Sequence, residues 1–134
     1  MGMTNSNDKI QTSNQIQNSK FKTFDLEERT ALYGEKTIKF CRSVHLDEII
    51  RPLVNQVIRS GTSIGANYME ANGADSKKDF NCKIGICKKE AKETMHWMRM
   101  LAVALPERVE EIRTLWKEAH ELSLIFGSII IKNK

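Results

Sequence analysis

Three histidines and several glutamates are the side chains best suited to metal or acid-base chemistry. His45, His96 and His120 lie far apart in the chain, without the H-x-x-x-H or H-E-x-x-H spacing that places two metal ligands on one helical face. A di-metal cage in a helix bundle needs Glu-x-x-His on two helices, and here only Glu93 and His96 form it. We therefore predict no metal site and no cofactor.

The sequence also lacks the elements of nucleotide or nucleophilic chemistry. It has no G-x-x-x-x-G-K-[ST] loop and no G-x-G-x-x-G after a strand, so no backbone cradle for a phosphate is predicted. Cys41, Cys82 and Cys87 are odd in number, and their spacing matches neither a disulfide framework nor a zinc site. We interpret them as small core or near-surface thiols. With no nucleophile placed beside a base, we predict that the protein is not an enzyme.

A strip of polar residues follows one helical face in the middle of the chain. Its members are spaced four, four and three positions apart: Arg59, Ser63, Asn67 and Glu70. In one interpretation the strip is a hydrogen-bonded seam, in which Arg59 and Asn67 satisfy carboxylates of another helix. The candidate carboxylates are Glu90 and Glu93. In the other interpretation the strip is a surface that contacts a ligand or a second subunit.

Positive charge is concentrated between residues 76 and 105. This segment has seven Lys and Arg against three Asp and Glu, whereas residues 25–48 have four against six. Six of the basic residues fall partly on the face opposite the apolar stripe: Lys77, Lys78, Lys88, Lys89, Lys92 and Arg99. They fit a solvated helix face. If an assembly repeats that face around an axis, they also fit a surface that holds a phosphate backbone without reading its sequence.

The composition divides the chain into a tail and one domain. Residues 1–22 are rich in Asn, Gln, Ser and Thr, which predicts a disordered N-terminal tail, and residues 23–134 are predicted to form the domain. No apolar run approaches the ~20 residues of a membrane span, and the start of the chain lacks the apolar core of a secretory signal. We expect a cytoplasmic protein with no membrane partner.

Two helices are predicted in the first half of the domain. The first covers about 25–44, with Thr23 or Asp25 as its cap, and the second covers about 49–71, with Gly73 after its end. The apolar stripe of the first helix has a spacing of three and four: Leu26, Thr30, Tyr33, Thr37, Phe40, Cys41 and Val44.

The second half of the domain predicts two longer helices. The third opens at Asp75 or Ser76 and ends at Pro106, which begins the fourth. The apolar stripe of the third helix is Phe80, Ile84, Cys87, Ala91, Thr94, Met98, Leu101 and Leu105. The apolar face of the fourth helix covers more than half its circumference, which indicates burial between subunits as well as within the chain. Five aromatic and sulfur-containing side chains are interpreted as core or interface residues: Met95, Trp97, Met98, Met100 and Trp116.

Small residues dominate the segment from Arg59 to Ala71, which reads RSGTSIGANYMEA. Each glycine inside a helix costs about 1 kcal/mol relative to alanine, so a compensating contact is expected. Gly61 and Gly65 therefore predict a close approach of two helices. With no alternating strand pattern, the four helices predict an all-α fold, an antiparallel up-down-up-down four-helix bundle.

Three segments of the sequence resemble a known family. They are the small-residue segment 59–71, the motif S-x-x-D-F-x-x-K-I at 76–84, and KEAKETMHWM at 89–98. Together they resemble the bacterial four-helix-bundle proteins encoded in intervening sequences of 23S ribosomal RNA genes. The resemblance implies a left-handed antiparallel bundle that assembles as a ring, typically a pentamer, with no established enzymatic activity. Lys88, Lys89 and Lys92 depart from the pattern, since many relatives are less basic there.

A second set of proteins similar to this family suggests a partner. The accessory proteins of diversity-generating retroelements resemble it in fold, bind nucleic acid and pair with a reverse transcriptase. Two hypotheses follow. In the first, the protein is a homo-oligomeric interaction module that presents a surface to another protein or to RNA. In the second, it is a nucleic-acid-binding accessory factor acting on ribosomal RNA or on the template of a reverse transcriptase.

Overall fold

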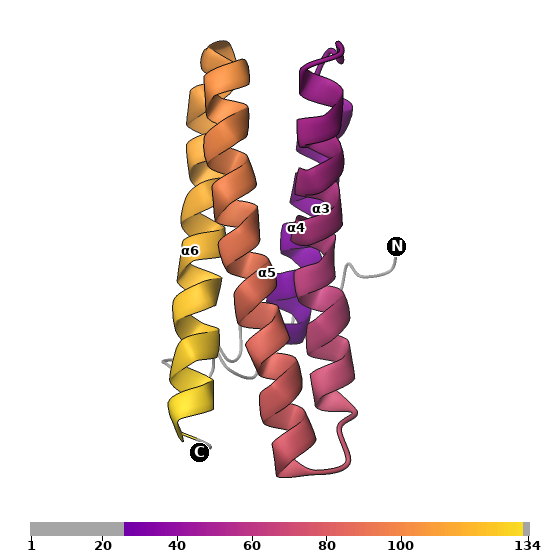
Figure 1. Ribbon diagram of the computed structural model, residues 1–134, viewed down its shortest axis with the longest axis vertical. Helices are drawn as coiled ribbons and strands as arrows, with labels where there is room; N and C mark the ends of the chain where they lie inside the picture. Colours follow the sequence, from indigo (N-terminus) through magenta and orange to yellow (C-terminus); the bar gives the residue numbers. More distant parts are fainter. Residues whose placement is uncertain (1–25, 133–134) are drawn as a thin grey trace, which may run out of the picture.

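The computed structural model describes residues 26–132, which form four long α-helices and one short 3-10 turn (Figure 1). The elements in chain order are α3 (Leu26–Arg42), α4 (Ile50–Asn72), α5 (Lys77–Ala104), η2 (Pro106–Arg108) and α6 (Val109–Lys132). No strand occurs within 26–132, so the all-α prediction is confirmed for this part of the chain. The predicted tail and the cap at Thr23 or Asp25 lie outside the described residues.

Local signals account for the helix boundaries. The hydroxyl of Ser76 accepts a hydrogen bond from the amide of Asp79 at 3.0 Å and so caps α5, as predicted. At the start of α4, a carboxylate oxygen of Asp47 accepts from the amides of Ile49 and Ile50. Pro106 ends α5, but the next residues form the 3-10 turn η2 before α6 begins. The fourth α-helix therefore starts three residues later than predicted.

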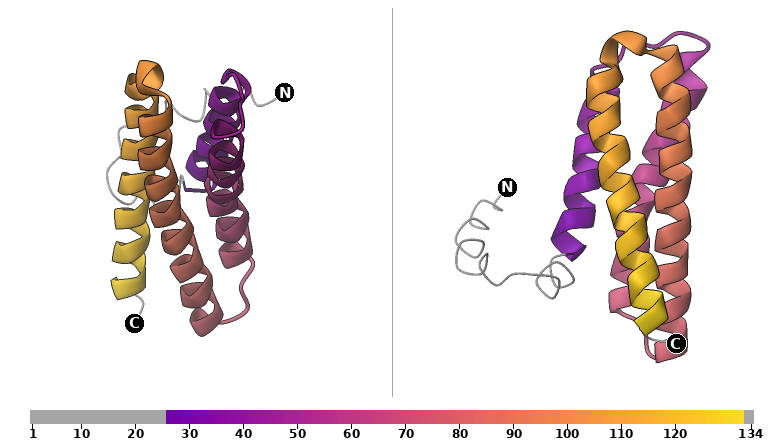
Figure 2. Two further views of the ribbon diagram at one scale, coloured as in Figure 1. Left: turned by 45° about the horizontal axis from the view of Figure 1, so that its top comes forward. Right: turned by 90° about the vertical axis from the view of Figure 1, so that its left-hand side faces the viewer.

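Helices that follow one another in the sequence pack side by side, whereas α3 and α6 are farther apart (Figures 1 and 2). The contacts between α3 and α4 run in opposite order along the two helices, since Thr30 meets Gly65 and Thr37 meets Gly61. The contacts between α4 and α5 also run in opposite order, since Ser60 forms a hydrogen bond with Thr94 and Glu70 pairs with Lys83.

The small-residue segment of α4 packs against α3. A Cβ atom on Gly61 would lie 3.1 Å from the Cγ2 atom of Thr37, and one on Gly65 would lie 3.3 Å from the carbonyl oxygen of Thr30. These spacings leave almost no room for a side chain, so the predicted close approach of two helices is confirmed. The threonine hydroxyls are satisfied within α3 by bonds to the carbonyls of Leu26 and Tyr33.

The core contains the predicted apolar stripes. All seven members of the first stripe are buried, and the third stripe is buried from Ile84 to Leu105, with Phe80 half-buried at its edge. Trp97 and Trp116 are half-buried against the core. On α6, Leu115, Leu122 and Phe126 are buried within the chain, whereas Leu124 and Ile131 stay 60% and 73% exposed.

Candidate functional site

The polar strip of α4 forms an ion-pair seam with α5. The guanidinium of Arg59 donates to Glu90 at 3.3 Å and to Glu93 at a shorter distance. Trp97 donates its indole N–H to the same oxygen of Glu93 at 3.3 Å, which fixes that carboxylate from a second side. The side chain of Glu90 is only 17% exposed, while that of Arg59 is 44% exposed. The structure thus joins one strip residue, Arg59, to both candidate carboxylates, Glu90 and Glu93, at the surface of the α4–α5 contact.

The rest of the strip does not join this cluster. Asn67 donates to the carbonyl of Ser63, and the hydroxyl of Ser63 donates to the carbonyl of Arg59, so both bonds stay inside α4. The expectation that Asn67 satisfies a carboxylate of another helix is therefore wrong, because its amide reaches the carbonyl one turn earlier. Glu70 instead pairs with Lys83 at 3.0 Å, and this hydrogen bond raises the pKa of Lys83.

A buried hydroxyl pair lies beneath the seam. Thr94 on α5 donates to the hydroxyl of Ser60 on α4 at 2.9 Å, and neither residue is exposed to solvent. Ser60 also donates to the carbonyl of Gln56. Thr94 likewise lies 2.8 Å from the carbonyl oxygen of Glu90, so each hydroxyl also has a partner within its own helix. The pair adds a polar contact between α4 and α5 inside the core. Sequence reasoning placed Thr94 in the apolar stripe and passed over Ser60.

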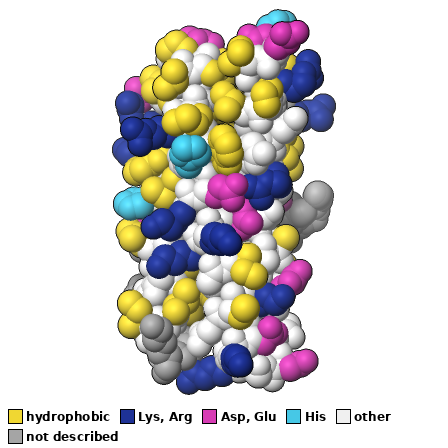
Figure 3. Space-filling model, in the orientation of Figure 1, with side chains coloured by type: hydrophobic (Ala, Val, Ile, Leu, Met, Phe, Trp, Pro, Cys, Tyr) yellow, Lys and Arg dark blue, Asp and Glu magenta, His cyan; other side chains and the backbone are white. Residues whose placement is uncertain are grey.

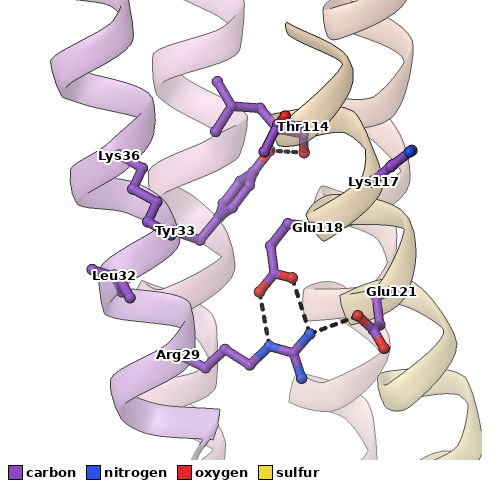
Figure 4. A pocket seen from close by; sticks show the side chains of 9 residues that line it. Arg29, Leu32, Tyr33, Lys36, Thr114, Lys117, Glu118 and Glu121 are labelled. Atoms are coloured by element: carbon purple, nitrogen blue, oxygen red, sulfur yellow. Dashed lines mark hydrogen bonds and ion pairs between the residues drawn. The ribbon is translucent and has the colours of Figure 1, made fainter. Parts of the chain in front are cut away.

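A second ion-pair cluster links α3 to α6, the two neighbouring helices that are farther apart than the others. Figure 4 shows Arg29 pointing from α3 toward two carboxylates of α6. It donates to both oxygens of Glu118, at 2.8 and 3.0 Å, and to Glu121 at 3.0 Å. The bond to Glu118 raises the pKa of Arg29, so the guanidinium stays charged.

Tyr33 lies beside this cluster (Figure 4). Together with Arg29, Glu118 and Glu121 it lines a cavity of about 260 Å³. Its hydroxyl donates to the carbonyl of Leu115 at 2.9 Å, and burial raises its pKa. The phenol therefore stays protonated and acts as a fixed donor between α3 and α6. Neither Arg29 nor Tyr33 was a predicted site residue. The spacing of Glu118 and Glu121, three positions apart on α6, is the signal that could have indicated a shared cation.

The basic residues of α5 do not form one continuous face. Lys77 and Lys78 are exposed in the first turn of the helix, and Lys89 is exposed farther along it. Lys88 and Lys92 line a groove between α5 and α6, and Arg99 lines a second groove beside Trp116. Figure 3 shows Lys and Arg side chains interspersed with hydrophobic ones on the face that α5 and α6 present. None of the six makes an ion pair within 26–132.

Two of the three thiols are buried, and the part of the chain that the structure describes contains no cluster that could hold a metal ion. Cys41 and Cys87 are buried and Cys82 is exposed, in agreement with their interpretation as core or near-surface thiols. Burial raises the pKa of Cys41 to about 11 and that of Cys87 to about 12, so both are protonated near neutral pH. Among residues 26–132, no three His, Cys, Asp or Glu side chains come close enough to bind a metal ion. No helix in this range could cross a membrane.

The fold and the seam define a four-helix bundle held by interhelix ion pairs. The chain belongs to the 23S rRNA-intervening sequence protein family, whose model matches residues 22–128. A crystal structure of a protein of unknown function from the S23 ribosomal protein family of Bacteroides thetaiotaomicron is similar, with a TM-score of 0.67 and 27% identity. The similarity covers 78% of this chain and 96% of that one. A comparison with curated proteins finds no match.

Proposed function

We propose that this protein is a non-enzymatic, homo-oligomeric interaction module of the cytoplasm. Its unit is a left-handed, antiparallel up-down-up-down bundle, and the assembly presents a surface to another protein or to RNA. One observation carries the proposal. Large apolar side chains remain exposed on the single chain, and two of them, Ile131 at 73% and Leu124 at 60%, line the same groove between α5 and α6. Exposed apolar side chains that lie together are typical of surfaces that contact another chain.

The protonation states support a role without catalysis. Burial raises the pKa of Tyr33, Cys41 and Cys87, which keeps all three protonated and disfavours them as nucleophiles or bases. The carboxylates of Glu90 and Glu93 are occupied by Arg59. These groups hold helices together, and such contacts commit a bundle to no reaction.

The assembly that we propose is a cyclic homo-oligomer, with a pentamer as the specific expectation from the family resemblance. Multi-angle light scattering at micromolar concentration tests this, because it gives mass independently of shape. A particle of five subunits supports the pentamer. Any other closed oligomer supports a cyclic homo-oligomer but not the number of subunits. A monomer over the whole concentration range contradicts it.

A second candidate function is binding of nucleic acid, either ribosomal RNA or the template of a reverse transcriptase. The observation in its favour is that Lys77, Lys78 and Lys89 are exposed and make no ion pair within 26–132. If these lysines neutralise phosphates, affinity for a generic RNA should fall steeply with salt concentration. A variant with all three changed to Glu should lose this binding and keep its mass. Binding that is absent at low salt contradicts the candidate.

A further inference from the structure

Two grooves of opposite charge lie on different sides of the bundle. The first, which we call the acidic groove, lies between α3 and α4 and has a volume of about 370 Å³. Its charged lining residues are all glutamates: Glu27, Glu28 and Glu35. Small residues also line it, including Gly34, Gly65 and Ala66, where α3 and α4 approach closely. The groove can therefore admit side chains of another molecule.

The second groove, which we call the basic groove, lies between α5 and α6 and has a volume of about 690 Å³. Its charged lining residues are all lysines: Lys88, Lys92 and Lys132. The ammonium nitrogen of Lys88 lies 3.6 Å from the position that a Cβ atom would occupy on Gly127. This lysine therefore lies across α6 and carries its charge into the groove.

Each groove also exposes two large apolar side chains. Ile38 and Met69 line the acidic groove and are 42% and 53% exposed. Leu124 and Ile131 line the basic groove and are 60% and 73% exposed. Within 26–132, half of the large hydrophobic side chains that remain exposed lie in these two grooves. Protein–protein interfaces commonly combine apolar contacts with patches of opposite charge on the two partners.

The two grooves lie at the same level along the bundle. Gly65 in the acidic groove packs against Thr30, and its neighbour Ile64 accepts a hydrogen bond from the thiol of Cys87 at 3.7 Å. Lys88, which follows Cys87, reaches Gly127 in the basic groove. Two copies can therefore join groove to groove with little shift along the helix axes.

We propose that the acidic groove of one subunit binds the basic groove of a second copy of this chain. This inference rests on the proposed self-assembly and names the surfaces that perform it. Such a contact joins two different surfaces, so it closes into a ring when successive rotations add up to a full turn. Because α3 and α6 are farther apart than the other neighbouring helices, the two grooved faces converge toward the α4–α5 side. Subunits of this wedge shape form a ring with α4 and α5 on the inside.

Charge exchange between the grooves tests the proposal. Glu28→Lys with Glu35→Lys reverses the acidic groove, and Lys88→Glu with Lys92→Glu reverses the basic one. None of these side chains makes an ion pair within 26–132, so the fold should survive, which circular dichroism checks. Each double variant should fall to the mass of one subunit in light scattering. The quadruple variant restores opposite charges and should regain the wild-type mass.

Two controls carry the same changes in charge outside both grooves. Glu48→Lys with Glu107→Lys, and Lys77→Glu with Lys78→Glu, alter exposed residues and should keep the wild-type mass. If the wild type is assembled and reversal of the acidic groove leaves its mass unchanged, the assignment of surfaces is overturned while self-assembly stands. A quadruple variant that stays monomeric also overturns the assignment. A monomeric wild type overturns the proposed function itself.

Discussion

The carbonyl oxygen of Thr30 on α3 lies 3.3 Å from the position that a Cβ atom would occupy on Gly65 of α4. The obstacle is backbone, so it cannot move aside as a flexible side chain would. Close packing at this point therefore depends on glycine, and it brings α3 and α4 together along the acidic groove.

A leucine at position 65 should overpack this contact. We expect Gly65→Leu to lower the free energy of unfolding by about 1–3 kcal/mol, the usual cost of forcing extra atoms into a close-packed site. The matched control is Gly85→Leu on α5, because a Cβ at Gly85 meets nothing within 4 Å. That control should be as stable as the wild type or more stable, since glycine is a poor helix former. Urea denaturation of both variants measures the difference, and equal stabilities would contradict the contact.

The cluster around Arg29 should contribute more than an ordinary surface ion pair. Its side chain is only 18% exposed and holds Glu118 in a two-pronged bond, so Arg29→Ala leaves a partly buried carboxylate without its partner. We expect a loss of about 1–3 kcal/mol. The control is Arg113→Ala, which breaks the exposed pair with Glu110 and should cost less than about 1 kcal/mol. Thermal denaturation of both variants would refute this if the two losses were equal.

Substitution of Arg59 and substitution of Asn67, the two strip residues that were predicted to bind carboxylates of another helix, should differ in their effect on the free energy of unfolding. Arg59→Ala removes the link between α4 and the carboxylates of Glu90 and Glu93, and should cost about 1 kcal/mol. Asn67→Ala removes a bond within α4 only and should stay within about 0.5 kcal/mol of the wild type. Urea midpoints measured side by side give the answer. A larger loss for Asn67→Ala would show that its amide has a partner on another helix after all.

The sequence predicts contacts along a helix better than contacts between distant helices. Periodic apolar residues defined all four helices, and glycine at positions 61 and 65 indicated a close contact without naming its partner, α3. The link from Arg59 to Glu90 was one of two interpretations of the strip. The cluster of Arg29 with Glu118 was missed, because the two residues are 89 positions apart and only the packing of α3 beside α6 brings them together.

The three thiols should differ sharply in reactivity. Cys82 is exposed, whereas Cys41 and Cys87 are buried with raised pKa values, so neither forms the reactive thiolate near neutral pH. We expect an aromatic disulfide reagent at pH 8 to modify one thiol per chain in the folded protein and three in urea. In the variant Cys82→Ala, the reagent should modify no thiol in the folded protein and two thiols in urea. Rapid modification of two thiols in the folded wild type would contradict the burial.

The same two buried thiols should make the protein less stable at alkaline pH. In the unfolded chain a cysteine ionises near its ordinary pKa of 9.0, whereas burial raises the pKa to about 11 for Cys41 and about 12 for Cys87. Between these values the unfolded state has already released protons that the folded state still holds. Stability should therefore be unaffected by these groups below pH 9, fall as the pH rises above it, and level off near pH 12.

Urea denaturation between pH 8 and 10.5 measures this slope. Cys87→Ala removes the thiol with the larger rise in pKa and should make stability fall less steeply with pH than in the wild type. Cys82→Ala removes an exposed thiol and should leave the slope unchanged, although it too lacks one cysteine. Other groups that titrate in this range contribute equally to all three proteins, so the comparison isolates Cys87. A slope that is the same in Cys87→Ala and in the wild type would show that ionisation of this thiol is not coupled to folding.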